Sequence, residues 1–172
     1  RGGTIIINMD DKYYNYFLNK AKNKKLKTIS FSEKNKNANV VFLKEKKIKK
    51  KYLITLKINH KIKTFFISKE LLNYKQNILA SVSIIINYFE IEKLNKNLFI
   101  DFNIPKSRGS IINYNKGSNK LTIVDESYNS NPLSFKFALE KFDSIYKENN
   151  KKFLLIGNML ELGKLSKKLH IK

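Results

Sequence analysis

The chain has 172 residues, of which 42% are apolar, and its 12 Phe and 9 Tyr are enough to build a folded core. It has no cysteine and two histidines, which excludes disulfides and thiolate metal sites and argues against zinc chemistry. The formal net charge is +21, and among the 35 basic residues only Arg1 and Arg108 are arginine. Proteins that read bases usually use the bidentate geometry of Arg, so an excess of Lys favours a solvated surface over a nucleic-acid site.

Composition leaves one alternative function open, a basic nucleic-acid-binding module. Two stretches, residues 22–27 and 44–51, are rich in Lys, and the many aromatic rings could stack on bases. The longest apolar run, residues 78–89, is interrupted by polar residues and is too short to span a bilayer. No charged and apolar leader is recognisable. We therefore expect a cytoplasmic, monomeric protein without membrane insertion. Because the sequence begins at Arg1 without Met, we also expect a partial chain.

The first two thirds of the chain predict an α/β unit. A β-branched run at residues 4–8 predicts a buried strand, and apolar residues at helical spacing predict a helix that ends at the Lys-rich stretch from residue 22. Further strands are predicted at residues 28–31, 40–43, 52–58 and 62–67, the last three as an antiparallel meander. Helices are predicted over residues 71–89 and 91–99.

The only Pro/Gly punctuation in the middle of the chain, residues 105–109, predicts a domain boundary, with domains at 1–104 and 105–172. Strands at 110–114 and 121–124, a helix at 132–146 and a strand at 153–156 follow. Alternating strands and helices indicate a parallel α/β sheet.

The first motif is the stretch from Asp125 to Pro132, which joins a predicted strand to a predicted helix. Asn131 and Pro132 are ordinary helix-start residues, an N-cap and a first-turn proline. Asp125 and Glu126 are not explained in this way, because they follow a buried strand at the end where α/β sheets bind ligands. There a carboxylate can accept both ribose hydroxyls of a nucleotide, and the Asn129 amide can reach phosphate or adenine. From the residues alone, common helix capping is the simpler interpretation of the motif, and a nucleotide site is the alternative that it leaves open.

Other candidates carry weaker signals. Gly157 and Gly163 bracket a strand-to-helix connection, a common arrangement. Asn77 precedes an apolar helix and either caps it or contacts an adenine edge, and capping is the simpler interpretation. Arg108, the one internal arginine, suggests a planar contact to phosphate or carboxylate. His170 is interpreted as structural.

Taken together, these segments resemble the Mur ligase family. The strand and turn at residues 3–11, the Asn-Ile-Leu-Ala at 77–80, Arg108-Gly109, the Ser-Tyr-Asn-x-Asn-Pro at 127–132 and the Met-Leu-Glu-Leu-Gly at 159–163 occur in the family's order and spacing. The last two are most similar to the MurF type. A folate-polyglutamylating ligase would fit the fold but not Ser127-Tyr128-Asn129.

The resemblance implies a fold and an activity. The fold would be α/β, the later half of the Mur ligase central ATP-binding domain plus the start of a Rossmann-like C-terminal domain. The activity would be ATP-dependent ligation of D-alanyl-D-alanine to UDP-N-acetylmuramoyl-tripeptide through an acyl phosphate. ATP and Mg²⁺ would be required, with the magnesium ligands and the phosphate loop upstream of Arg1, so that this chain alone would not ligate.

The resemblance also implies roles for individual residues. ATP would be bound by four residues: Asn77 at adenine, Arg108 at the phosphates, Asp125 at the ribose, and Asn129. Ser127, Tyr128 and Asn131 would line the cleft near the substrate. Asn158 stands where the family has Asp, and Asn73-Tyr74 stand where it often has His-Asn. No residue of this chain is assigned as a catalytic nucleophile or metal ligand.

Overall fold

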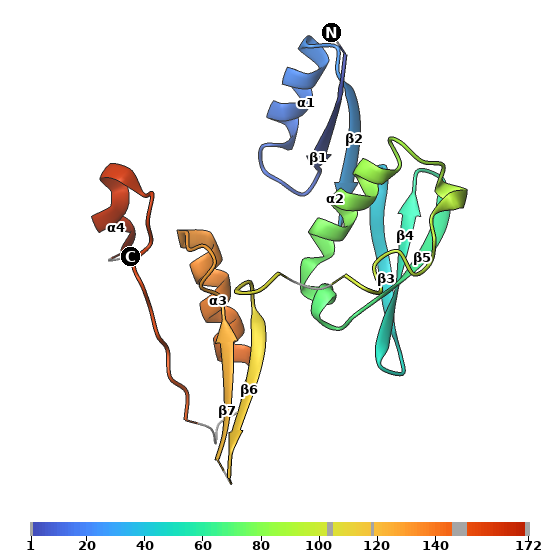
Figure 1. Ribbon diagram of the computed structural model, residues 1–172. Helices are drawn as coiled ribbons and strands as arrows, with labels where there is room; N and C mark the ends of the chain where they lie inside the picture. Colours follow the sequence, from blue (N-terminus) through green and yellow to red (C-terminus); the bar gives the residue numbers. More distant parts are fainter. Residues whose placement is uncertain (1, 103–104, 118, 146–150, 171–172) are drawn as a thin grey trace. The chain divides into compact units, whose positions relative to one another are not determined.

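The computed structural model describes residues 2–102, 105–117, 119–145 and 151–170 (Figure 1). The chain divides into two compact units, residues 1–103 and 104–172. Each unit has a sheet of its own, with five strands in the first and two in the second. The α/β class predicted from the sequence is confirmed.

The sheet of the first unit has the strand order β1-β2-β3-β4-β5. β1 and β2 are parallel, and β2 pairs with β3 in parallel through two residue pairs. The β3–β4 and β4–β5 pairs are antiparallel, as the meander prediction requires. The strands are β1 (Thr4–Asn8), β2 (Lys27–Ser32), β3 (Val40–Ile48), β4 (Lys51–Ile58) and β5 (Lys61–Ile67).

The core of this unit lies on the meander. Ile54, Leu56 and Ile58 in β4 and Phe65 and Ile67 in β5 are almost wholly buried. Their spacing of two residues is that of side chains on one face of a strand. Burying each such side chain contributes about 1.5–3 kcal/mol, so these five positions are a substantial part of the apolar burial that stabilises the unit.

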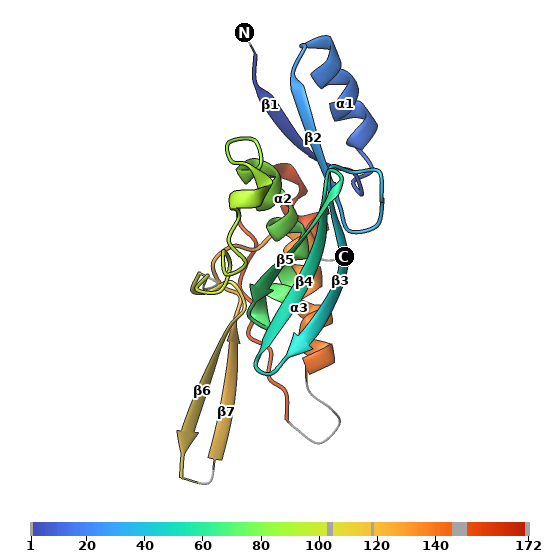
Figure 2. The same ribbon diagram turned by 90° about the vertical axis from the view of Figure 1, so that its right-hand side faces the viewer.

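Two helices flank the sheet, α1 (Tyr14–Asn23) and α2 (Lys75–Ile85), and Figure 2 shows them on opposite sides of it. α2 buries Ile78, Leu79 and Val82, which share one helical face. Its first turn joins β1 through a hydrogen bond from Asn8 Nδ2 to Gln76 Oε1 (3.3 Å).

The predicted helix over residues 71–89 is shorter in the structure. It opens as a 3-10 turn, η1 (Glu70–Tyr74), and the α-helix ends at Ile85. Three successive β-branched Ile residues, 84–86, are poor helix formers. Asn87 Oδ1 then accepts hydrogen bonds from Thr4 Oγ1 (3.1 Å) and Lys27 Nζ (3.3 Å), which hold the chain against β1 and β2.

The predicted helix over residues 91–99 is wrong. Only one 3-10 turn forms, η2 (Ile91–Lys93), and the backbone is extended at Leu94. The Lys96 carbonyl accepts the Phe66 N–H (2.8 Å), and Phe99 packs edge-on against Phe65 at 5.6 Å between ring centroids. This segment covers the meander instead of forming a helix.

The second unit contains an antiparallel hairpin of β6 (Ser110–Lys116) and β7 (Asn119–Asp125), followed by α3 (Pro132–Ile145). A 3-10 turn, η3 (Gly163–Leu165), and a short helix, α4 (Ser166–His170), come last. The predicted strand at 153–156 is not formed: among the described residues it has no strand partner, and its apolar side chains are exposed. A strand needs a neighbour for its backbone hydrogen bonds, so the parallel sheet expected here is not present in the described part of this unit.

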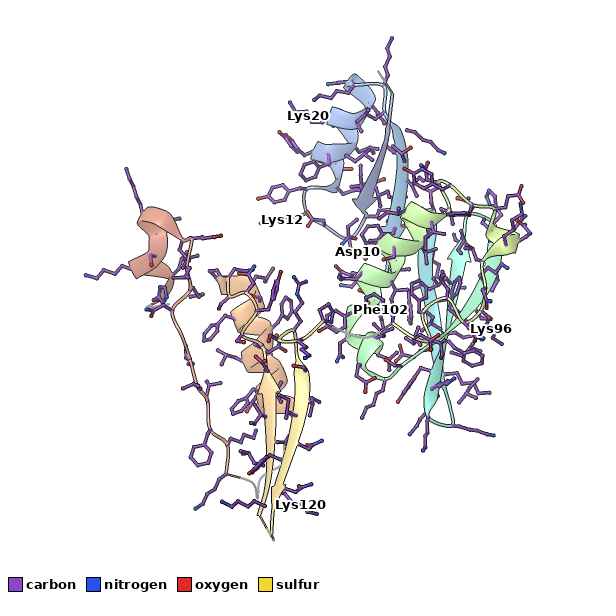
Figure 3. The ribbon with its side chains drawn as sticks, in the orientation of Figure 1. Asp10, Lys12, Lys20, Lys96, Phe102 and Lys120 are labelled. Atoms are coloured by element: carbon purple, nitrogen blue, oxygen red, sulfur yellow. The ribbon has the colours of Figure 1, made fainter. Side chains whose placement is uncertain are left out.

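Burial differs sharply between the units. Among the described residues, every buried apolar side chain belongs to residues 1–103 except Met159, which is 7% exposed. Lysines lie on the surface: Lys20 in α1 and Lys120 in β7 are exposed, as is Lys12 in the turn between β1 and α1 (Figure 3). In the described ranges, no helix is long and apolar enough to cross a membrane.

Candidate functional site

The candidate site lies at the open end of the β6–β7 hairpin. Asp125 is the last residue of β7, and its carboxylate accepts hydrogen bonds from Ser107 Oγ (2.8 Å) and the Ser127 N–H (3.0 Å). The Asp125 carbonyl accepts the N–H of Gly109 (2.8 Å). The turn that enters β6 and the loop that leaves β7 are therefore joined through one aspartate.

These contacts favour the ionised form of Asp125. Hydrogen bonds from the side chain and backbone of Ser127, together with one from Ser107, lower the pKa of Asp125 below its ordinary value. The carboxylate is therefore a fixed hydrogen-bond acceptor at neutral pH. Such an acceptor suits the hydroxyls of a ribose or another polyol.

Arg108 and Tyr128 form the second part of the site. The Arg108 guanidinium carbon lies 4.1 Å from the centre of the Tyr128 ring, a cation–π contact, and both side chains are exposed. The Tyr128 N–H donates to the Ser107 carbonyl (3.0 Å). The planar, permanently charged guanidinium is therefore supported by an aromatic ring and suits an anionic group such as phosphate.

The start of α3 confirms the capping interpretation of Asn131 and Pro132. Asn131 Oδ1 accepts the N–H groups of Leu133 (3.1 Å) and Ser134 (2.9 Å), and Ser134 Oγ accepts the Asn131 N–H (3.0 Å) in return. Pro132 is the first residue of the helix. The Asn131 side-chain oxygen is thus engaged in a reciprocal cap.

A groove of about 540 Å³ adjoins this site within the second unit. Most of its wall is apolar, and Asp125, Ser127 and Asn129 supply polar groups. Asn158 also lines it, whereas Arg108, Tyr128 and Asn131 do not. Much of the apolar lining comes from the exposed side chains of residues 153–156, the segment that pairs with no strand among the described residues.

His170 is structural, as the sequence indicated. Its Nε2 accepts the backbone N–H of Met159 (3.0 Å), and its Nδ1 lies 2.8 Å from the Ser166 carbonyl, to which it donates. The ring therefore joins α4 to the segment that leads into it. Gly163 and Glu161 have left-handed backbones, with φ of +54° and +61°, and lie in the turns between Met159 and α4.

In the first unit, the capping interpretation of Asn77 is wrong. Asn77 is the third residue of α2 and is exposed, and the N-cap position belongs to Tyr74, whose side chain makes no capping hydrogen bond. The turn after β1 is held to the end of β2 by hydrogen bonds. Asp10, which lies beside α2 in Figure 3, accepts hydrogen bonds from Ser32 Oγ (2.5 Å) and the Glu33 N–H (2.7 Å).

Six of the seven predicted site residues, all except Asn77, belong to the second unit, at or near the open end of the hairpin. Sequence reasoning missed Ser107, which contacts Asp125 directly. One signal could have indicated it: Ser107 directly precedes Arg108-Gly109, one of the segments that carry the family resemblance. In the part of the chain that the structure describes, no three His, Asp or Glu side chains lie close enough to hold a metal ion.

Two comparisons decide the family. Residues 1–85 match the Mur ligase middle domain. Over 169 residues the chain is 31% identical to the UDP-N-acetylmuramoyl-tripeptide–D-alanyl-D-alanine ligase of Rickettsia prowazekii (strain Madrid E). The chain belongs to the Mur ligase family. The alignment covers 96% of this chain and 35% of that relative, so the chain spans about a third of the relative's length.

Solved structures agree with the Mur ligase fold. MurF from Acinetobacter baumannii matches with a TM-score of 0.70 and 20% identity, covering 97% of this chain and 34% of that protein. MurF from Thermotoga maritima, solved in complex with ADP, matches with a TM-score of 0.64 and 21% identity, covering 97% and 36%. The likeness extends over both units of this Mur ligase chain.

Proposed function

We propose that this chain is part of an ATP-dependent amide ligase that adds D-alanyl-D-alanine to UDP-N-acetylmuramoyl-tripeptide in peptidoglycan precursor synthesis. The observation that carries the proposal is the 31% identity to the Rickettsia prowazekii ligase of that name, which extends over nearly the whole chain. Residues 1–104 are proposed as the later part of the central ATP-binding domain. Residues 105–172 are proposed as the start of the C-terminal domain. The proposed location is the cytoplasm.

The nucleotide contacts proposed for the second unit follow from its chemistry. Asp125 presents an ionised, oriented carboxylate to the ribose hydroxyls, and Arg108 presents a supported guanidinium to the phosphates. Asn129, which is exposed at the same loop, adds an amide. In the first unit, exposed Asn77 is proposed as the adenine contact.

Three neighbouring residues are proposed to line the substrate cleft. Ser127 and Tyr128 follow Asp125 directly, and both are exposed. Asn131 is the third, although its Oδ1 is engaged in the helix cap, so it would contact substrate through its amide nitrogen. None of the three is assigned as a nucleophile.

In the proposed reaction, ATP transfers its terminal phosphoryl group to the substrate carboxylate, which gives an acyl phosphate and ADP. The amine of D-alanyl-D-alanine would then attack the acyl carbon, form the amide bond and release inorganic phosphate. Mg²⁺ is proposed to accompany the ATP phosphates, but we assign no magnesium ligand among the described residues of this chain. The contribution of the chain's own residues is charge neutralisation and alignment, which dominate phosphoryl-transfer catalysis.

Nucleotide binding by this chain can be tested by titrating it with ADP and following backbone amide NMR signals. We expect ADP to shift the signals of Arg108, Asp125 and Asn129 in the second unit and the signal of Asn77 in the first. IDP should reduce the effect at Asn77 because it lacks the adenine amino group. His60, in the β4–β5 turn, serves as an internal control that should not shift. No ADP-dependent change at any of the four residues would contradict the proposed site.

A further inference from the structure

Ser107 has an unusual backbone for a serine. Its φ is +62°, in the left-handed region that glycine adopts readily and other L-residues rarely adopt. Such conformations persist where the surroundings determine them, and they concentrate at functional sites. The contacts of Ser107 must therefore stabilise this conformation.

Three groups of Ser107 make hydrogen bonds within the second unit. Its N–H donates to Ser110 Oγ (3.3 Å), its carbonyl accepts the Tyr128 N–H (3.0 Å), and its hydroxyl donates to Asp125 Oδ2 (2.8 Å). The left-handed turn thus aims both the carbonyl and the hydroxyl at the loop that leaves β7.

The two partners at that loop matter for nucleotide binding. Asp125 is the proposed ribose acceptor, and the Tyr128 ring lies against the guanidinium of Arg108, the proposed phosphate contact. Ser107 therefore acts on both contacts: on Asp125 through its side chain and on Tyr128 through its backbone. A glycine in this conformation would make only the backbone contact.

We propose that Ser107 is a positioning residue for nucleotide binding, whose hydroxyl orients the Asp125 carboxylate toward the ribose. One Asp125 oxygen is occupied by Ser107 and the other by the Ser127 N–H, and each keeps lone pairs for ligand hydroxyls. The carboxylate is thus oriented before the nucleotide binds, and less ordering is needed on binding. This inference rests on the proposed function.

The test uses the 172-residue chain, with ADP as the probe, and two substitutions. Ser107→Ala removes the hydroxyl and keeps the left-handed strain, whereas Ser107→Gly removes the hydroxyl and relieves the strain. We expect both to weaken ADP binding several-fold and to raise the pKa of Asp125, followed by NMR of its carboxyl carbon. We expect no such weakening for 2′,3′-dideoxy-ADP, because that ligand lacks the hydroxyls that Asp125 would accept.

Controls separate this inference from the proposed function. Asn113→Ala removes another side-chain hydrogen bond of the hairpin, which Asn113 Oδ1 accepts from Thr122 Oγ1 (2.9 Å), and should leave ADP binding unchanged. If Asp125→Asn weakens ADP binding but Ser107→Ala does not, the positioning role is wrong and the nucleotide site stands. If wild type does not bind ADP, or Asp125→Asn binds it as wild type does, the ribose assignment and this inference both fall. Equal weakening of ADP and dideoxy-ADP by Ser107→Ala would also overturn the positioning role.

Discussion

At the scale of single residues, the site depends on one carboxylate whose surroundings keep it ionised. Ser127 and Ser107 donate hydrogen bonds to Asp125, and these contacts exist only in the folded chain. The hydrogen bonds lower the pKa of Asp125 below its value in the unfolded chain, where an aspartate has a pKa of about 3.9. Folding stability and ionisation of Asp125 are therefore linked.

The linkage predicts an acid-sensitive contribution to stability. Because the folded pKa is the lower one, the contribution is fully present above the unfolded pKa and is lost as the pH falls through the folded value. Urea unfolding of the second unit, measured at a series of acidic pH values, should show a steeper loss for wild type than for Asp125→Asn. Parallel pH profiles for the two proteins would contradict the assigned hydrogen bonds.

At the scale of elements, local chemistry identified some features and tertiary context decided others. The cap at Asn131 and the proline at the start of α3 were readable because their signals lie within four residues. The sequence could not show that residues 153–156 form no strand. An apolar run indicates a tendency to form a strand, but it does not indicate whether a neighbouring strand is available. The end of the long predicted helix was missed for a similar reason: Asn87 bonds to residues 60 and 83 positions away.

The cap supports a quantitative prediction. Asn131→Ala removes the acceptor for two N–H groups at the start of α3, and such losses cost about 0.5–2 kcal/mol. We expect faster amide exchange in the first turn of α3, at Leu133 and Ser134. Asn131→Asp retains a capping oxygen and should exchange nearly as wild type does; equal acceleration in both variants would exclude the cap as the cause.

The site itself was only partly predictable from the sequence. Asp125 and Arg108 were singled out because a carboxylate after an apolar strand and a lone internal arginine are unusual for this chain. The burial expected for that strand is wrong: Leu121 and Ile123 are exposed, because the described part of the second unit packs no second layer over them. The contact between Arg108 and Tyr128 and the hydroxyl of Ser107 on Asp125 join residues about 20 positions apart through a left-handed turn. No local pattern indicates that conformation at a serine.

At the scale of the whole molecule, the two units differ in how much core they contain. The first buries a contiguous set of apolar side chains on its meander, whereas Met159 is the single buried apolar side chain among the described residues of the second. Exposed apolar groups in the second unit include Ile111, Phe137 and Leu155. Since stability derives largely from apolar burial, the second unit should open at a much lower free energy.

Native-state hydrogen exchange of the whole chain can measure this difference. We expect strong protection for amides of β4 and β5 and much weaker protection for paired amides of β6 and β7. Leu56→Ala, which opens a cavity at a fully buried position, should destabilise the first unit by about 2–5 kcal/mol and lower protection there. Comparable protection in the two sheets of the wild-type chain would show that burial does not control their stability.

The most direct test of the proposed amide ligase is a chimera in which this chain replaces the matching segment of the Rickettsia prowazekii ligase. Release of ADP would be measured with each substrate alone and with both, and Asp125→Asn would serve as the matched variant. The proposal predicts release that requires both UDP-N-acetylmuramoyl-tripeptide and D-alanyl-D-alanine and that falls strongly in Asp125→Asn. A folded chimera that binds ADP but releases none in response to D-alanyl-D-alanine would contradict it.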